Sequence, residues 1–223
     1  MAMALIDSFA ASPGVRKAVE FIYLSDSPPR VSGAQGAALL LFCTHYAMQT
    51  SEPLITIFQD NDRLNLFERE LAWLLEAEGL SSHFQLLPFP DYDIPELDSP
   101  GAVADTRKKR LKALDAVYSG GGPVPWLIAT ERGAARRTMP ANTFRDLTVV
   151  ISEGAQLPMA TLLDALVTTG YQRRSTVREA GQFCVRGGMV DVFPAQADEP
   201  VRIETAGDRI DEIRPFDTET QRS

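Results

Sequence analysis

The first part of the chain alternates between short apolar runs and longer stretches in which apolar residues recur at helical spacing. The runs RVSG, PLITIF, FQLLPF and WLIAT predict short strands. The stretches AQGAALLLFCTHYAM and NDRLNLFERELAWLLEAEG, together with residues 106–118, predict the helices between them. Strands separated by helices of this length favour a parallel α/β sheet with right-handed connections.

The helix that follows PLITIF has the strongest pattern. Its apolar side is formed by Leu64, Phe67, Leu71, Leu74 and Leu75. Residues 60–62 offer side-chain oxygens that can cap the first turn, and Gly79 can end the helix in a left-handed turn. The pattern therefore predicts a helix with well-defined ends and one buried side.

After residue 145 the apolar pattern changes to a period of two. LTVVISEG predicts a strand, and PMATLLDALVTTGY predicts a helix whose apolar side is Leu162, Leu163, Leu166 and Val167. QFCVRGG, MVDVFPA, PVRIETA and RIDEIRPFD predict successive short strands joined by glycine turns. We therefore expect an α/β domain with a parallel sheet at residues 1–145, followed by a smaller α+β domain with an antiparallel sheet at residues 146–223.

The composition is that of a globular protein with an acidic surface. The 223 residues are 44% hydrophobic and carry 22 basic against 30 acidic side chains, a formal charge of −8. A protein that binds nucleic acid through phosphate neutralisation needs a concentrated positive face. The densest basic run, RKKRLK at residues 107–112, lies on several sides of a predicted helix. A solvated helix surface is one interpretation of this run, and a nucleic-acid contact is the other.

Targeting and metal-binding signals are absent from the sequence pattern. No apolar run approaches the roughly 20 residues that span a bilayer, and the first residues lack a basic and then apolar leader, so we expect a cytoplasmic protein. Cys43 and Cys184 have no metal-ligand spacing with each other or with His45 and His83. We expect both cysteines to be structural core residues and no metal to be bound.

The glycine loop VSGAQGAAL, residues 31–39, has the context of a phosphate-binding loop but not its chemistry. It is predicted to follow a strand and to open a helix whose first amides could face an anion at Gly33. A functional P-loop needs a lysine and a Ser or Thr hydroxyl, but Gly36, Ala37 and Ala38 stand where these groups would be. A small-residue turn that lets helix and strand pack closely is therefore favoured over nucleotide binding.

The sequence offers no catalytic constellation. Neither histidine lies in a nucleophile motif, and there is no GxSxG turn. Asp91 and Asp93 lie in a proline-rich loop without a partner base, where carboxylates more often cap turns than transfer protons. We therefore predict that this chain alone is not an enzyme.

Residues 181–223 resemble the small domain of the bacterial transcription-repair coupling factor (Mfd) family and, more distantly, the matching domain of the excision-repair helicase UvrB. The resemblance is carried, in this order, by VRGGMVDVFP, by PVRIE and GDRIDEIR on either side of residues 205–206, and by FDTETQRS. FPDYDIPELDSP and the glycine loop agree more weakly with the same family. The resemblance thus covers nearly the whole chain, strongly over the last forty residues or so.

The resemblance implies a UvrB-like module at the N-terminus of a much longer motor protein. In that family the full protein binds stalled RNA polymerase, translocates on double-stranded DNA with ATP and magnesium, and recruits the repair protein UvrA through the small domain. The family's decayed ATP site agrees with the missing lysine, so neither cofactor is expected in this chain, which we interpret as a fragment. The alternatives are an ATP-binding helicase subunit of UvrB type and a DNA-binding module that uses residues 107–112.

The resemblance also implies which residues contact UvrA. The arginine of VRGG and the arginine of VRIE, which are Arg186 and Arg202, belong to the family's contact surface. The alternative for Arg186 is a simple ion pair with Glu204 across the sheet. The family's two aromatics after VRIE are replaced here by Thr205 and Ala206, and the second of them belongs to the UvrA contact. We therefore expect a docking surface that lacks its apolar anchor at Ala206.

Overall fold

The computed structural model describes residues 4–24, 30, 32–92 and 100–222. The chain forms two compact units. Met1–Pro95 and Ala113–Arg136 make the first unit, and Glu96–Lys112 and Arg137–Ser223 make the second. None of the helices in the described part combines the length and apolar character that a bilayer-spanning segment requires.

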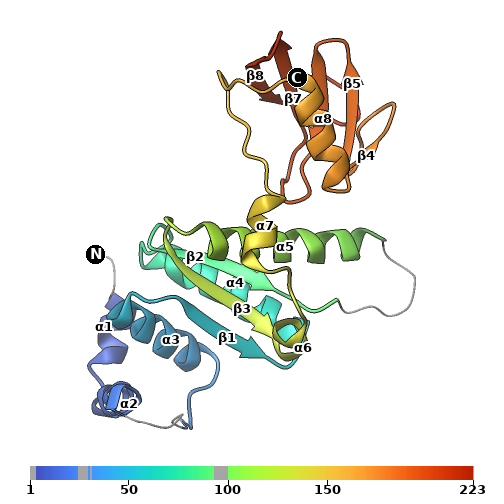
Figure 1. The fold of residues 1–223 in the computed structure, drawn as a ribbon. Helices are drawn as coiled ribbons and strands as arrows, with labels where there is room; N and C mark the ends of the chain where they lie inside the picture. Colours follow the sequence, from blue (N-terminus) through green and yellow to red (C-terminus); the bar gives the residue numbers. More distant parts are fainter. Residues whose placement is uncertain (1–3, 25–29, 31, 93–99, 223) are drawn as a thin grey trace. The chain divides into compact units, whose positions relative to one another are not determined.

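The first unit is built on a parallel three-stranded sheet (Figure 1). Its strands are β1 (Leu54–Phe58), β2 (Phe84–Phe89) and β3 (Val124–Thr130), in the order β1-β3-β2. The helices are α1 (Ala4–Ala10), α2 (Pro13–Leu24), α3 (Ala37–Thr50), α4 (Asn61–Ala77), α6 (Glu131–Ala135) and the end of α5 (Pro100–Ser119). The predicted parallel α/β arrangement is confirmed.

Different helices pack on the two faces of this sheet. One face presents Trp126 and Ile128 to the apolar sides of α3 and α4. The other face presents Leu87, Phe89 and Ala129 to α5. Alternation along each strand separates these two sets, because successive side chains point to opposite faces.

Helix α4 has the ends and the buried side that its sequence predicts. The Asp60 carboxylate accepts a hydrogen bond from the Arg63 backbone N–H at 2.8 Å, as expected of an N-cap. At the other end Gly79 has a φ of 72°, a conformation that glycine adopts without steric cost. All five residues of the predicted apolar side are buried: Leu64, Phe67, Leu71, Leu74 and Leu75.

The prediction of a strand ahead of the glycine loop is wrong. Arg30, Ser32 and Gly33 pair with no strand, and Val31 lies outside the described residues. The preceding described element is helix α2, in which Val19 is buried. A single β-branched residue between Arg30 and Ser32 is too short a signal to indicate a strand. The acidic end of the proline-rich loop, residues 93–99, also lies outside the described residues.

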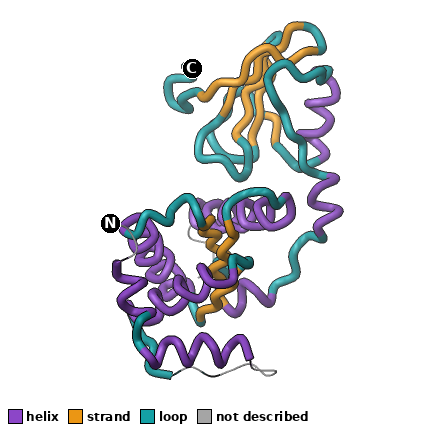
Figure 2. Tube along the Cα trace, turned by 90° about the vertical axis from the view of Figure 1, so that its left-hand side faces the viewer, coloured by secondary structure: helices purple, strands orange, loops and turns teal. Residues whose placement is uncertain are grey.

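The second unit carries a five-stranded sheet with one long helix against it (Figure 2). The sheet order is β4-β5-β6-β7-β8. Besides the beginning of α5, its elements are α7 (Ala141–Asp146), α8 (Met159–Thr168), β4 (Gln172–Arg173), β5 (Gln182–Arg186), β6 (Met189–Phe193), β7 (Val201–Ala206) and β8 (Arg209–Pro215). The sheet is mixed, because β4 pairs with β5 in parallel whereas β5 to β8 form the predicted antiparallel ladder.

Two details of the second unit differ from the prediction. LTVVISEG forms no strand, and Val150 is 86% exposed. The residues just after it approach β8 instead, since the Ile210 N–H donates to the Ala155 carbonyl at 2.9 Å. Val167 is also exposed, because it lies about 100° around helix α8 from the buried Leu166.

Candidate functional site

The sheet of the second unit has an apolar face and a charged face. Alternation places Phe183, Val190, Val192, Ile203 and Ile210 toward α8, where they form the core. The opposite side, called here the charged face, carries Cys184, Arg186, Met189, Asp191, Arg202, Glu204, Glu212 and Arg214. The register thus brings Arg186 and Arg202, which are far apart in the sequence, to the same face of the sheet.

Asp191 and Arg202 form a buried ion pair at the centre of this face. The two residues lie opposite each other on β6 and β7. The Arg202 Nε donates to Asp191 Oδ1 at 2.7 Å, and its Nη2 donates to Oδ2 at 3.0 Å. The Asp191 side chain is only 2% exposed and that of Arg202 is 12% exposed. The hydrogen bond to Asp191 raises the pKa of Arg202, so its guanidinium stays charged.

Arg202 is held by further contacts on its other sides. Its guanidinium lies over the Phe216 ring, with 5.1 Å from Cζ to the ring centroid. Its Nη2 also donates to the main-chain oxygen of Gln221 at 3.3 Å. The guanidinium is therefore part of the structure of this face as well as a feature of its surface.

Arg186 has a different environment. It ends β5 at a two-residue turn in which Gly187 has a φ of 60°, so the predicted tight turn is confirmed. Its side chain is exposed and forms one long hydrogen bond, 3.4 Å from Nη2 to Gln221 Oε1. The alternative ion pair with Glu204 is not among the ion pairs of the described residues, and Glu204 contacts Arg214 instead.

Ala206 ends β7 and is exposed. The register shifts between Glu204 and Thr205, but the additional residue is on β8, so alternation continues along β7 and places Ala206 on the charged face with the two arginines. The turn at residues 207–208 then leads into β8. All three predicted partner-binding residues therefore share one face of the sheet.

A turn at residues 217–222 covers part of the charged face. Asp217 Oδ1 accepts hydrogen bonds from the backbone N–H groups of Thr220 and Glu219. These bonds lower the pKa of Asp217, and the bonds from Thr220 have the largest effect. Phe216, just before the turn, is buried against Val177 and Cys184. Sequence reasoning used FDTETQRS only as a mark of resemblance and missed Gln221, because its contacts depend on how the turn folds back.

The predicted nucleotide loop lies in the first unit, away from the charged face in the sequence and in a separate compact unit. Helix α3 begins at Ala37 with Gly36 at its N-cap position and no side-chain cap. The N–H of Ala38 already donates to the Gln35 carbonyl at 3.2 Å. Ala37 lines a largely apolar cavity of about 480 Å³ with Leu40 and Trp73, and the wall of this cavity also includes Arg69 and Glu70.

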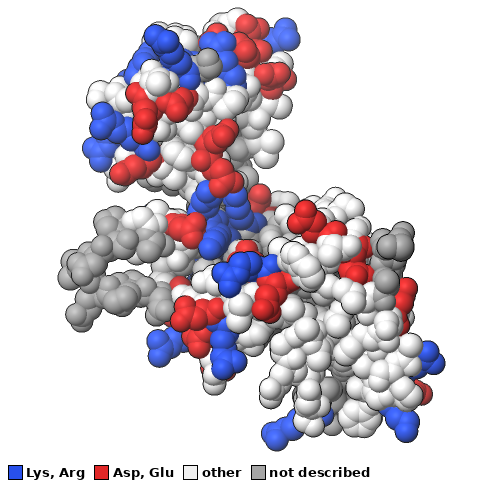
Figure 3. All heavy atoms as spheres, turned by 180° about the vertical axis from the view of Figure 1, so that it is seen from behind, with Lys and Arg blue, Asp and Glu red and all other residues white. Residues whose placement is uncertain are grey.

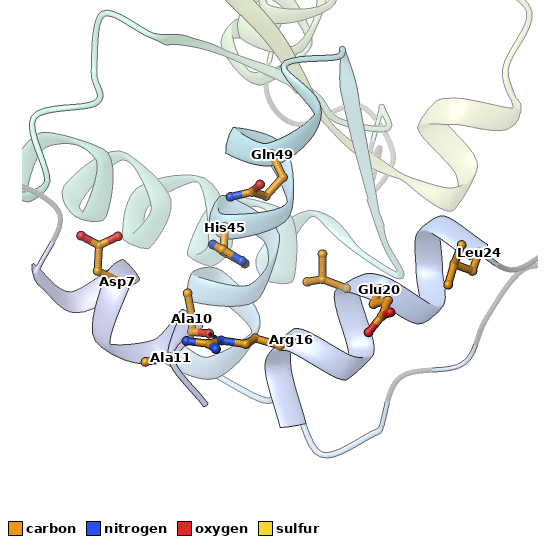
Figure 4. A pocket seen from close by; sticks show the side chains of 9 residues that line it. Asp7, Ala10, Ala11, Arg16, Glu20, Leu24, His45 and Gln49 are labelled. Carbon is orange, nitrogen blue, oxygen red and sulfur yellow. Dashed lines mark hydrogen bonds between the residues drawn. The ribbon is translucent and has the colours of Figure 1, made fainter. Parts of the chain in front are cut away.

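Other cavities of the first unit have polar walls without a catalytic arrangement. In the cavity of about 570 Å³ beside α3, His45 and Gln49 project from α3, and Arg16 and Glu20 project from α2 (Figure 4). Arg16 Nε donates to the Ala10 carbonyl at 3.3 Å. Among the described residues no group of three or more His, Cys, Asp or Glu side chains could hold a metal ion.

The remaining candidates of the sequence have structural contacts. Asp91 is buried, its Oδ1 accepts from Arg136 Nε at 2.7 Å, and its backbone exchanges two hydrogen bonds of 3.1 Å with the Asn61 side chain. Asp93 lies outside the described residues. Cys184 is buried, whereas Cys43 is partly buried against the core of the first unit, where burial raises the pKa of its thiol to about 11.

The basic run at residues 107–112 is largely paired. Lys108 and Lys112 both form ion pairs with Asp198, and their hydrogen bonds lower the pKa of that carboxyl to about 2. Arg110 is buried. The second unit likewise shows basic and acidic side chains side by side on the face seen in Figure 3. These pairings leave little positive charge for phosphate contacts.

Comparisons with known proteins found a match to the last third of the chain and relatives that align with most of its length. Residues 149–223 match the UvrB interaction domain. The transcription-repair-coupling factor of Myxococcus xanthus is 32% identical over 198 residues, which cover 87% of this chain and 16% of the relative. Those of Bacillus subtilis (strain 168) and Staphylococcus aureus (strain MSSA476) are 26% and 28% identical over 193 residues, 86% of this chain and 16% of each relative.

The residues that match the UvrB interaction domain thus include the sheet that carries the charged face. Over most of its length, the chain that carries this domain is a relative of the transcription-repair coupling factors. It spans about 16% of the length of these curated relatives.

Proposed function

We propose that this chain is a non-catalytic docking module from the N-terminal part of a transcription-repair coupling factor, and that it binds UvrA through the charged face. In this proposal the module recruits UvrA to stalled RNA polymerase during transcription-coupled nucleotide excision repair. The observation that carries the proposal is the placement of Arg186, Arg202 and Ala206 on one face of a UvrB interaction domain.

The environments of the two arginines suggest different contributions. The exposed Arg186 guanidinium can bind a carboxylate of UvrA directly, because a planar guanidinium suits such a contact. Arg202 presents only the edge of its guanidinium, since Asp191 and Phe216 occupy the rest. We propose that Arg202 both shapes the charged face and contributes to its positive potential.

The first unit is proposed to be the remnant of a P-loop-like domain. Its loop at Gly33, Gly36, Ala37 and Ala38 lacks the lysine and hydroxyl that a magnesium nucleotide needs. ATP hydrolysis, translocation on double-stranded DNA and polymerase binding are accordingly assigned to other parts of the parent protein. An ATP-binding subunit is less well supported, because the loop lacks these two groups. A DNA-binding module is less well supported, because Lys108 and Lys112 are paired with Asp198.

A titration of the chain with UvrA from the same organism tests the proposal. We expect saturable binding in isothermal calorimetry, and weaker binding as salt rises, because a charged face supplies the contact. UvrB should compete for the same site, since UvrB carries the matching domain. The absence of binding at protein concentrations of tens of micromolar would contradict the proposal.

Replacing Ala206 by phenylalanine is expected to strengthen UvrA binding. Ala206 is exposed at a strand end, so a ring fits there without disturbing the core. A buried aromatic beside an arginine contributes about 1–2 kcal/mol, which is a gain of roughly 5- to 30-fold in affinity. The measurement is the dissociation constant of Ala206→Phe by calorimetry.

Ala206→Ser is the matched control, because it alters the same position without adding apolar area. The gain should also disappear when Arg186→Glu is combined with Ala206→Phe. A gain that survives this combination would show non-specific adhesion of the ring and would count against a shared docking surface.

A further inference from the structure

Gln221 occupies a strained position at the centre of the turn that covers the charged face. Its φ is 59°, which a residue other than glycine adopts only when the surrounding contacts hold it there. Its backbone N–H donates to the Asp217 carbonyl at 2.8 Å and thereby closes the turn. Side-chain length and backbone conformation are therefore both constrained at this position.

The polar groups of Gln221 connect several segments of the second unit. The amide nitrogen Nε2 donates to the Val177 carbonyl at 3.3 Å and to the Thr218 carbonyl at 2.7 Å. The amide oxygen Oε1 accepts from Arg186, and the main-chain oxygen accepts from Arg202. One residue thus joins β5, β7 and the loop before β5 to the turn.

The turn itself is firmly attached to the sheet. The N–H of Phe216 donates to the Pro200 carbonyl at 3.2 Å, and the Phe216 ring is buried. The N–H of Asp217 donates to the Arg222 carbonyl at 2.8 Å, which closes the turn around Gln221. The Gln221 amide oxygen is therefore a fixed acceptor beside a long and otherwise exposed arginine.

We propose that Gln221 is a positioning residue for docking: its side chain holds Arg186, and its main-chain oxygen holds Arg202, in the arrangement that receives an acidic patch of the partner. This inference rests on the proposed function. An exposed arginine loses side-chain entropy when a partner immobilises it. A hydrogen bond that restrains Arg186 before binding removes part of that entropy loss. Gln221 thus raises the affinity by preorganising Arg186, without contacting the partner itself.

The test is a calorimetric titration of UvrA with Gln221→Gly. Glycine keeps the main-chain oxygen for Arg202 and adopts a positive φ without strain, so the melting temperature should not fall by much. The affinity for UvrA should fall roughly three- to tenfold, because ordering one long side chain on binding has a cost of that size. Gln221→Asn, which tolerates the same backbone conformation but is too short to reach Arg186, should show the same loss.

A double-mutant cycle with Arg186→Ala separates positioning from a general effect on the fold. In the Arg186→Ala background, Gln221→Gly should change the affinity less than twofold, because the side chain that it positions is gone. Glu219→Ala, an exposed position in the same turn, is the matched control and should bind like the unaltered chain. Melting temperatures of all variants confirm that the titrations compare folded proteins.

The outcomes distinguish this inference from the proposed function. If Arg186→Ala weakens binding but both Gln221 variants bind like the unaltered chain, the positioning role is wrong and the docking function stands. If Gln221→Gly causes its full loss even without Arg186, the residue acts on the fold and the positioning role is again wrong. If Arg186→Ala leaves the affinity unchanged, the docking function itself is overturned.

Discussion

Replacing Arg186 by glutamate is expected to remove most of the affinity for UvrA while leaving the fold intact. The Arg186 side chain is exposed, and none of the described ion pairs includes it. A carboxylate in its place would face the acidic groups that the guanidinium is proposed to bind. Losing a charged contact of this kind costs about 2–4 kcal/mol, a decrease of roughly 30- to 1000-fold in affinity.

The measurement is the dissociation constant of Arg186→Glu for UvrA, with the melting temperature as a check of the fold. Arg173→Glu is the matched control. Arg173 is also an exposed arginine of the same sheet, but it lies opposite Phe183, on the side of the sheet that faces α8. Equal losses in the two variants would indicate a net-charge effect, and an unchanged affinity in Arg186→Glu would refute the docking face.

The parts of the fold that the sequence predicts are those with strong local signals. Helix α4 combines a cap at Asp60, a repeated apolar side and Gly79, so its ends needed no tertiary information. The hairpin strands β5 to β8 alternate clearly and are separated by glycine turns or a polar loop. In these segments local propensity and the final packing agree.

The missed elements depend on contacts that no local pattern encodes. Strand β4 is two residues long, and it exists because it pairs with β5 in parallel. LTVVISEG, residues 147–154, has the apolar content of a strand but forms none. Gly154 and the two residues after it contact β8 instead, which follows from the position of the β8 edge and not from their composition.

The candidate site was predictable only in part for the same reason. Strand alternation alone suggests that Arg186 and Arg202 can share a face, since each lies on a predicted strand. The pairing of Arg202 with Asp191 requires the register of β6 against β7, and the contact of Gln221 requires the turn to fold back. Long-range register is the information that the linear pattern lacks.

Arg202→Ala is expected to destabilise the second unit strongly. Its partner Asp191 is 2% exposed, so removal of the guanidinium leaves a carboxylate that cannot reach water. Breaking a buried ion pair from one side costs about 3–5 kcal/mol of unfolding free energy, which lowers the melting temperature of a domain of this size by at least about 10 °C. A loss of UvrA binding in this variant would therefore arise largely from the fold.

Two spectroscopic signals can assign this loss to the correct unit. Both tryptophans, Trp73 and Trp126, lie in the first unit, so their fluorescence reports only on that unit. Arg202→Ala should leave the fluorescence transition in place and shift a separate transition in far-ultraviolet circular dichroism. A shift of both transitions by the same amount would show that the two units unfold together. The decrease in unfolding free energy would then be measured from this one shared transition.

Arg214→Ala is the matched control for the buried pair. Arg214 also forms ion pairs on the charged face, but its side chain is 38% exposed and those of Glu204 and Glu212 are 30% and 47% exposed. Solvent screens such pairs, so this variant should lose no more than about 1 kcal/mol. The double variant Asp191→Ala with Arg202→Ala should lose less than the sum of the two single variants, because it leaves no buried charge without a partner. Additive losses, or a loss in Arg202→Ala no greater than in Arg214→Ala, would mean that the pair is not what holds this face of the sheet together.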